Sequence, residues 1–474
     1  MTTTTKLSMK TKIGYGLCTG AEAIPSNLLN VYFVFFLTDI VGIRAFLAGL
    51  ILFVVVLWDS LIDPIIGGLS DNHVTEKGRR LTWMRASLLP LAVVVFLMFS
   101  PFTFVGVVGE SIYYVLVAIL VCTSYSAFII PYFAMGGEIT KDYSERNNLR
   151  FISTFFYYPI FLLAASGPML IWEWASELGY TDREAWGFTG AIFAVLLLII
   201  CGVGLFLIRN CEKDSIKTAI VAKKKRVKES YLKIWGNCLR IKSFRKIIIW
   251  IFVYMLSVSM LNTVVVFFMT HNVGMSESEQ ALFWVVFVGA TVVFLPVVTK
   301  FCNIFGKKPV MLFCMSPCVI AGFILFFTGI NSMAIMYLYT VLYVLASSSF
   351  FAFYIGYAYD CVEIDEFKSG VRKDGSMSSL ASFAQQCGMA LSLPFTGLYL
   401  ELTGYDGMAA TQTDSALQGI LTLATLFPSI LALIALFILF TYPVSKKKYE
   451  LLSKAIENKN NNLPYSTDGF EDLF

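Results

Sequence analysis

Charged residues are scarce in this chain. Asp, Glu, Lys and Arg make up 14% of its 474 residues, against about 25% in a typical soluble domain. Hydrophobic residues make up 57%, and they fall in blocks of about 18 residues or more, the length that spans a hydrocarbon core. This composition excludes a soluble globular protein of this size and predicts an all-α, polytopic membrane protein.

Histidine is rare, and cysteine lacks a functional pattern. The two histidines are His73 and His271, which argues against a proton relay built on histidines. The ten cysteines form no CxxC pair and no Cys/His cluster, so their expected role is apolar packing. Because no nucleophile with a base and no metal cluster stands at membrane depth, we expect neither an enzyme nor a cofactor. The N-terminus shows no cleavage site, which predicts that the first span is retained.

The apolar blocks predict twelve transmembrane helices in two six-helix bundles. We expect an N-terminal bundle at 1–208, a basic linker at 209–246, a C-terminal bundle at 247–442 and a polar tail at 443–474. Such an arrangement favours a transporter, whose solute site lies between the halves near the midplane. The predicted helices cover 13–38, 45–69, 82–101, 110–136, 150–172, 187–208, 247–270, 279–302, 309–329, 333–359, 377–402 and 417–442.

Basic residues predict the orientation in the membrane. If both termini are cytoplasmic, all of the 36 Lys and Arg residues except Arg44 and Arg183 fall on the cytoplasmic side. This asymmetry follows the positive-inside rule and predicts a multi-pass protein of the cell inner (plasma) membrane. The run KKKRVK at 223–228 is read as a solvated connector, with an anionic-lipid site as the alternative.

Two acids lie inside the second predicted helix. Asp59 and Asp63 are four residues apart and share one helix face. Two carboxylates this close in a low dielectric need a cation, a proton or a basic partner. Since no Lys or Arg lies in the middle of a predicted span, a bound proton or sodium ion is the expected partner. The alternative is a water-filled crevice with two solvated acids.

Further polar residues interrupt the other apolar spans. Glu22, in the first helix, is either a residue that reaches water, a solute contact or a second proton site. The remainder either bond between helices or line a solute pocket. They are Asn27, Asn30, Tyr125, Ser126, Thr154, Tyr157, Tyr158, Gln385 and Gln386.

Several stretches resemble one transporter family. WDSLIDPIIGGLSD at 58–71 is followed by KGRR, and YDCVEIDEFKSGVRKDGSMSSL stands at 359–380. YGLCTGAE at 15–22, FFLTDIVGI at 35–43 and IPYFAMGGEIT at 130–140 add to the match. The chain thus resembles the glycoside–pentoside–hexuronide:cation symporters, the melibiose-permease-like members of the major facilitator superfamily. The resemblance implies alternating access and solute uptake driven by sodium, protons or lithium.

The resemblance also implies a cation site. The family's two cation-binding Asp residues match Asp59 and Asp63, and a helper hydroxyl matches Ser126. Melibiose permeases have an Asn immediately before the second Asp, where this chain has Ile62. One amide ligand for sodium is therefore missing, which favours proton coupling.

The family's sugar site is altered. Its charged sugar ligands align with Ala23, Ile129, Thr154 and Gln386, whereas its Tyr is kept as Tyr125 and its Trp appears as Phe133. Unsatisfied sugar hydroxyls cost about 1–3 kcal/mol each, so melibiose itself is disfavoured. The expected solute is a less polar molecule, or a sugar bound through Glu22, Asn27, Asn30 and Gln386.

Charges near the cytoplasmic ends suggest a gate. Asp360 and Glu363 end the tenth predicted helix, and Arg146 lies between the fourth and fifth. We expect salt bridges across the two halves to close the cytoplasmic side, with ordinary loop charges as the alternative.

The sequence as a whole predicts a cation-coupled symporter of a small organic solute. A flippase or transporter of a less polar amphipathic solute, such as a lysolipid, is the alternative. We expect a functional monomer in the lipid bilayer that does not bind nucleic acid.

Overall fold

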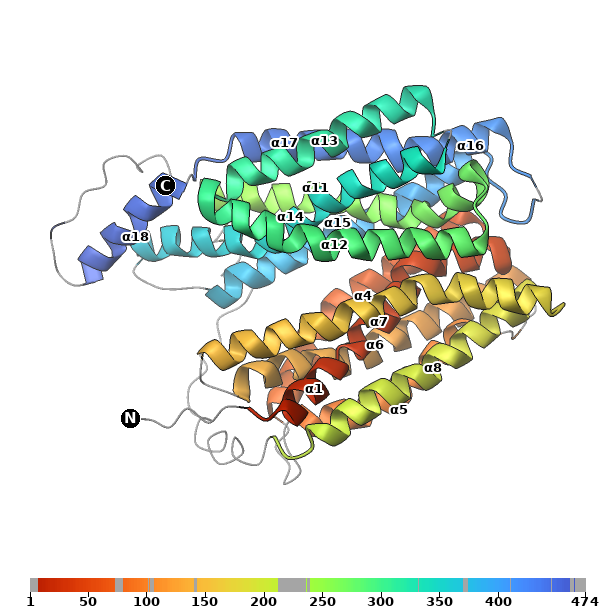
Figure 1. The fold of residues 1–474 in the computed structure, drawn as a ribbon, viewed down its shortest axis with the longest axis horizontal. Coiled ribbons are helices and arrows are strands. Elements are labelled where there is room, and N and C mark those ends of the chain that lie inside the picture. Colours follow the sequence, from red (N-terminus) through yellow and green to blue (C-terminus); the bar gives the residue numbers. More distant parts are fainter. Residues whose placement is uncertain are drawn as a thin grey trace. The chain divides into compact units, whose positions relative to one another are not determined.

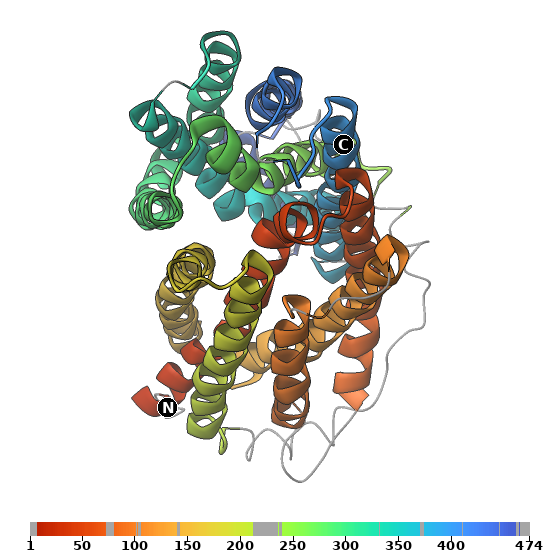
Figure 2. The same cartoon turned by 90° about the vertical axis from the view of Figure 1, so that its right-hand side faces the viewer.

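The computed structural model consists of helices and connecting turns. It describes residues 7–72, 80–100, 102, 106–139, 143–211, 236, 239–330, 332–369, 374–409, 411–444, 446–460 and 464. Helices fill the described part of the chain, which contains no strand (Figures 1 and 2). Helices are the expected form of such apolar segments, because a helix satisfies its own backbone hydrogen bonds inside lipid. The predicted all-α class is confirmed.

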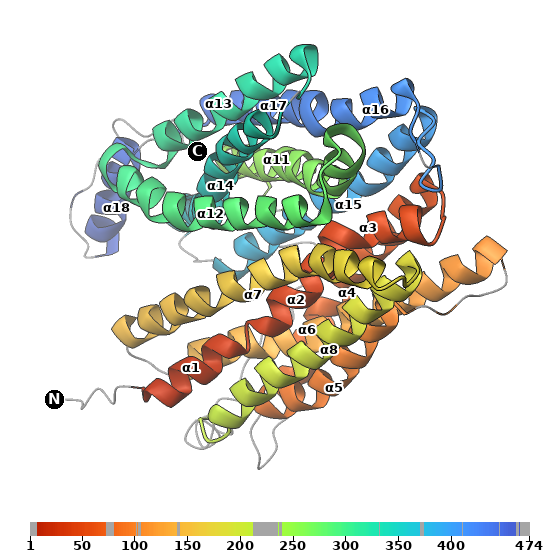
Figure 3. The same ribbon diagram turned by 45° about the vertical axis from the view of Figure 1, so that its right-hand side comes forward.

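The first span, Met9–Ile40, is an interrupted helix. Figure 3 shows its successive helical pieces. Pro25 lies inside the second piece and cannot donate a backbone hydrogen bond. Two π-helical turns follow, in which the backbone is wound more loosely than in an α-helix. In chain order the pieces are α1 (Met9–Leu17), α2 (Gly20–Asn27), η1 (Leu28–Tyr32), α3 (Phe33–Phe35) and η2 (Phe36–Ile40).

Five long helices complete the N-terminal part. α6 packs against α4 and α5, and α8 packs against α5 (Figure 1). Because α4 and α6 are adjacent, side chains on their facing sides can meet across the contact. The helices are α4 (Ala45–Asn72), α5 (Arg80–Met98), α6 (Gly106–Glu138), α7 (Tyr143–Glu177) and α8 (Asp182–Leu207).

The C-terminal part contains a second set of helices. α17 packs against α11 and α13, and α13 also packs against α14 (Figure 1). π-helical turns interrupt the spans that begin with α11 and α16. The elements are α11 (Lys242–Phe267), η3 (Phe268–Val273), α12 (Glu277–Phe305), α13 (Lys307–Thr328), α14 (Met333–Ser369), α15 (Asp374–Leu402), α16 (Asp414–Leu421), η4 (Thr422–Leu426), α17 (Phe427–Phe440) and α18 (Lys446–Asn460).

Packing divides the chain into two compact units. The first contains Met1–Arg226 together with Met269–Val285 and Gly397–Ala416, and the second contains the remaining segments. Two short pieces of the C-terminal sequence therefore pack with the N-terminal helices, one running from η3 into α12 and the other from the end of α15 into α16. The sequence-based domain limits at 208 and 247 stay a prediction, since most of the linker lies outside the described residues.

Eleven helices in the described part of the chain are long and apolar enough to span a membrane. They correspond to eleven of the twelve predicted spans. The counterpart of the remaining prediction, 377–402, is α15, which has 29 residues. Its first half is polar, with Ser379, Ser382, Gln385 and Gln386, and this lowers its hydropathy relative to the others.

The polar tail contains a helix that the sequence analysis did not predict. α18 packs against the end of α14, and Leu452 and Ala455 are buried there. Tyr449 donates a hydrogen bond of 2.8 Å to Glu363, and the Lys459 ammonium donates to the Phe367 carbonyl across 2.6 Å. The tail is therefore attached to the helix that carries the predicted gating acids.

Candidate functional site

The contact between α4 and α6 holds a hydroxyl against an acid. Ser126 is fully buried on α6, and its Oγ donates to Oδ1 of Asp59 on α4 across 3.2 Å. Asp59 is half-buried. A serine hydroxyl that bonds a carboxylate in this way can also offer its lone pairs to a cation at the same carboxylate.

The second acid and a cysteine lie at the same contact. Asp63 is close enough to Asp59 for the two carboxylates to repel each other. The buried thiol of Cys122, one turn before Ser126, interacts electrostatically with both acids. Cys122 was not predicted as a site residue, although its four-residue spacing from Ser126 places it on the same helix face.

A hydrogen bond braces the two helices beside the acids. The indole Nε1 of Trp58 donates to Oγ1 of Thr123 across 2.9 Å. Trp58 and Thr123 directly adjoin Asp59 and Cys122 in sequence. The brace fixes the register between α4 and α6, so it contributes to holding Ser126 opposite Asp59.

Glu22 is connected to this region through tyrosines. It lies half-buried on α2, and its carboxylate makes no salt bridge or hydrogen bond with any residue that the structure describes. Both Tyr125 on α6 and Tyr157 on α7 interact electrostatically with it. Tyr125 also interacts with Asp59. Four helices, α2, α4, α6 and α7, therefore bring Glu22, two phenols and the acid pair into one neighbourhood.

Two asparagines accompany Glu22 on the first span. Asn27 is 3% exposed, and its Nδ2 donates to the Ala23 carbonyl across 3.1 Å. Its Oδ1 has no hydrogen-bond partner among the described residues. Asn30 lies half-buried in the π-helical turn η1. A buried acceptor without a partner is costly, which makes Asn27 a candidate for binding a hydroxyl.

The remaining predicted solute contacts are less enclosed. Phe133 on α6 is 55% exposed. Thr154 on α7 is exposed, and its hydroxyl donates to the Arg150 carbonyl across 3.0 Å. Gln386 lies half-buried on α15, in the second unit.

The predicted gating acids have partners within their own unit. Lys307 on α13 contacts Asp360 on α14 at 2.7 Å, and its ammonium also donates to the Gly356 carbonyl. Glu363 accepts the hydrogen bond from Tyr449 described above. The side chain of the third predicted gating residue, Arg146, lies outside the described residues. The expected salt bridge across the halves stays a prediction.

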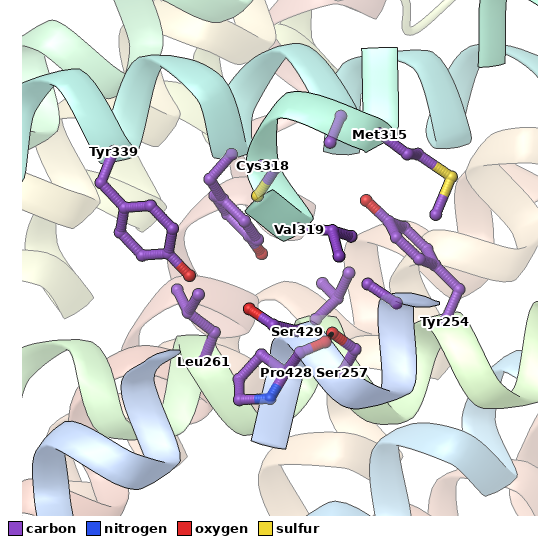
Figure 4. A pocket seen from close by; sticks show the side chains of 13 residues that line it. Tyr254, Ser257, Leu261, Met315, Cys318, Val319, Tyr339, Pro428 and Ser429 are labelled. Carbon is purple, nitrogen blue, oxygen red and sulfur yellow. Dashed lines mark hydrogen bonds between the residues drawn. The ribbon is translucent and has the colours of Figure 1, made fainter. Parts of the chain in front are cut away.

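A small cavity lies inside the second unit (Figure 4). Its volume is about 20 Å³, and helices α11, α13, α14 and α17 enclose it. Figure 4 shows Tyr254 and Tyr339 at opposite ends, with Ser257 and Ser429 along one side. This volume accommodates a water molecule but not a sugar, so the cavity is not the solute site.

The donor set at the acids suits a monovalent cation. Among the described residues, no group of three or more His, Cys, Asp or Glu side chains could hold a metal ion. Two carboxylates and a hydroxyl provide oxygen atoms, which hard cations prefer. Either carboxylate can equally accept a proton.

A family model for MFS/sugar transport proteins matches residues 14–446. The chain belongs to the MFS/sugar transport protein family. It is therefore a multi-span membrane transporter rather than an enzyme, and the resemblance to the glycoside–pentoside–hexuronide symporters is confirmed.

Individual relatives of this transporter cover nearly its whole length. It is 25% identical over 458 residues to the uncharacterized symporter YnaJ of Bacillus subtilis (strain 168), with 96% of each protein covered. It is also 25% identical to the isoprimeverose transporter of Lactiplantibacillus pentosus, with 86% of this chain and 83% of the relative covered. A solved D-xylose-proton symporter has the same fold, with a TM-score of 0.60, 14% identity and coverage of 93% and 98%.

Proposed function

We propose that this transporter is a cation-coupled symporter of a glycoside or other sugar-like solute. The observation that carries the proposal is the hydrogen bond between Ser126 and Asp59, with Asp63 beside it. Two neighbouring carboxylates bind a cation or a proton more readily than either alone. The relatives described as symporters and as an isoprimeverose transporter support this reading.

A proton is the favoured coupling ion. The position before Asp63 is Ile62, which supplies no oxygen ligand. A sodium ion at Asp59 and Asp63 would then lack a ligand that melibiose permeases provide, whereas a proton needs one carboxylate alone. Repulsion between the two acids also stabilises the state in which one of them is protonated.

The solute is expected to meet Glu22 and its tyrosines. Glu22, Tyr125 and Asn27 offer acceptors and a donor on facing helices, as hydroxyl groups require. Asn30, Thr154, Gln386 and Phe133 are proposed as further contacts. The predicted pocket contains no Lys or Arg, which favours a neutral solute over a hexuronide.

The orientation and the gate are also proposals. The distribution of Lys and Arg supports cytoplasmic termini and an inner-membrane location. Arg146, Asp360 and Glu363 are proposed to stabilise the closed cytoplasmic side. The pairs Lys307–Asp360 and Tyr449–Glu363 support a role for these acids in organising that end of α14.

The test replaces each acid by its neutral amide. Asp59→Asn and Asp63→Asn proteins are reconstituted in proteoliposomes and supplied with radiolabelled glycosides under separate proton and sodium gradients. We expect concentrative uptake to fall at least about 100-fold, while downhill exchange of the same glycoside persists, because only the coupling ion loses its site. Glu177→Gln, an exposed acid at the end of α7, is the matched control.

The outcomes separate the parts of the proposal. Loss of uptake under a proton gradient in both variants, with exchange retained, supports coupling at the acid pair. Full gradient-driven accumulation by both variants would overturn the coupling role. Absence of uptake and binding of every glycoside by the unmodified protein would overturn the solute class.

A further inference from the structure

Three side chains from distant parts of the chain meet at the end of the first span. Nε2 of His271 lies 3.0 Å from Oδ1 of Asp39 and 3.0 Å from the Tyr405 hydroxyl. The Tyr405 hydroxyl donates to the same Oδ1 across 2.5 Å. Asp39 lies in η2, His271 in η3 and Tyr405 in the turn after α15. All three belong to the first unit.

The contact is enclosed. The side chain of Asp39 is 8% exposed and that of His271 is 18% exposed. Tyr405 is 9% exposed. The carboxylate of Asp39 is therefore largely removed from water. Its contacts with His271 and Tyr405 compensate for the lost hydration. The hydroxyl of Thr38 adds a hydrogen bond to the other carboxylate oxygen.

Close backbone packing surrounds these side chains. Gly407 lies against Thr38, where an added Cβ would come within 2.5 Å of the Thr38 carbonyl. Gly397, near the end of α15, lies equally close to the Ala45 carbonyl at the start of α4. The contact is therefore an interlocked surface between two segments, Met269–Val285 and Gly397–Ala416, and the first two spans.

Three other charged residues lie at this surface, and two of them form a pair. Arg44 lies 3.5 Å from Glu401, and both are solvent-accessible. Asp406 interacts electrostatically with Tyr405 and adds negative charge. Asp39 therefore presents the negative charge that faces the imidazole, while the cation at Arg44 is engaged by Glu401.

We propose that Asp39, His271 and Tyr405 form a proton-operated latch, which closes this end of the transporter when His271 is protonated. A neutral imidazole gives the Asp39 carboxylate a hydrogen bond from an uncharged donor. A protonated imidazole adds the attraction between opposite charges to that bond, and this attraction is strong where water is excluded. The bond holds the segments Met269–Val285 and Gly397–Ala416 against the first two spans, so it opposes their separation. Histidine changes charge between about pH 5 and pH 8, which makes the latch responsive to ordinary changes of pH.

The latch is distinct from the coupling site. It uses none of the residues proposed to bind the cation or the solute. A proton at His271 would set how often this end opens, whereas a proton at the acid pair would set whether solute accumulates. The test below uses no solute and no ion gradient, so its failure and failure of the proposed function are distinguishable.

A cysteine beneath the interlocked surface reports opening. Ala45 is 4% exposed, so Ala45→Cys reacts with a fluorescent maleimide mainly when the surface separates. The labelling rate is measured in lipid nanodiscs, where both faces of the protein are accessible. Protein without the added cysteine gives the background from the native thiols. Because thiol reactivity itself varies with pH, each rate is divided by that of an Ala45→Cys/His271→Gln protein at the same pH.

The ratio of the Ala45→Cys labelling rate to that of the Ala45→Cys/His271→Gln protein tests the proposal. We expect it to fall at least about fivefold between about pH 8 and pH 5.5, since protonation closes the latch only where His271 is present. His271→Arg should label slowly at both pH values. Tyr405→Phe should retain the pH dependence, because the ion pair remains. A ratio that does not change with pH would overturn the latch.

Asp39→Asn provides an independent route in case His271→Gln does not fold. Size-exclusion chromatography identifies folded protein. Removing the Asp39 carboxylate should abolish the pH dependence of the Ala45→Cys labelling rate, as removing the imidazole does. The comparison is with the Ala45→Cys protein that keeps both Asp39 and His271. A folded Asp39→Asn protein that keeps the full pH dependence would contradict the proposal.

Discussion

The hydroxyl of Ser126 on α6 donates a hydrogen bond to Oδ1 of Asp59 on α4 across 3.2 Å. Ser126→Ala removes this hydrogen bond and distinguishes a proton from a sodium ion as the coupling ion. If a proton couples transport, the ionised carboxylate loses stabilisation, and the pH profile of uptake moves about one unit towards alkaline pH. If sodium couples transport, a ligand is lost, and the sodium concentration for half-maximal uptake rises about tenfold.

Initial rates of uptake at varied pH and varied sodium provide this measurement. Ser126→Thr keeps a hydroxyl and is the matched control. A Ser126→Ala protein with both profiles unchanged would show that the hydroxyl takes no part in ion binding.

The buried pair between Lys307 and Asp360 predicts a stability effect. The side chain of Asp360 is 9% exposed and that of Lys307 is 32% exposed. Lys307→Ala leaves the carboxylate without its cation and should cost about 2–3 kcal/mol, less than a fully buried pair because the ammonium is partly solvated. Asp360→Asn should cost less, since a neutral amide needs no counter-charge.

Thermal unfolding in detergent, monitored by size-exclusion chromatography, compares Lys307→Ala and Asp360→Asn with the double variant. We expect the double variant to be more stable than Lys307→Ala alone. Additive losses in the double variant would mean that the two side chains do not stabilise each other.

Gly397 predicts a packing effect that does not depend on charge. A Cβ at this position would collide with the Ala45 carbonyl, so Gly397→Ala should hold α15 away from the start of α4. We expect faster labelling of Ala45→Cys at every pH and slower transport. Gly289→Ala on α12 is the matched control, because nothing lies within 4 Å of its added Cβ. Equal labelling in the two glycine variants would exclude tight packing at Gly397.

Much of the fold was predictable from local sequence. Apolar blocks predict spans because lipid excludes unsatisfied backbone groups, and the predicted helices match the observed ones to within several residues at most ends. The π-helical turns were not predictable, because an apolar stretch such as Phe36–Ile40 has the same composition in either helix type.

The candidate site was predictable only in part. Asp59 and Asp63 stand out because acids are costly in a span, and the family resemblance suggested Ser126. Cys122 did not stand out, since a buried thiol resembles any packing residue. The meeting of Asp39 with His271 joins positions 232 residues apart, and no periodicity within one helix indicates such a contact.

The π-helical turns of the first span also determine which way Asp39 faces. Each π-turn accommodates about one residue more than an α-turn, so it rotates everything beyond it by about 100° relative to a regular helix. Deleting one residue from η1 would therefore turn Asp39 about a quarter of the circumference away from His271, while the composition of the span hardly changed. When this chain is aligned with a relative, residues of this span beyond position 32 lie on the same helix face in both proteins only if the relative keeps the extra residues of these π-helical turns.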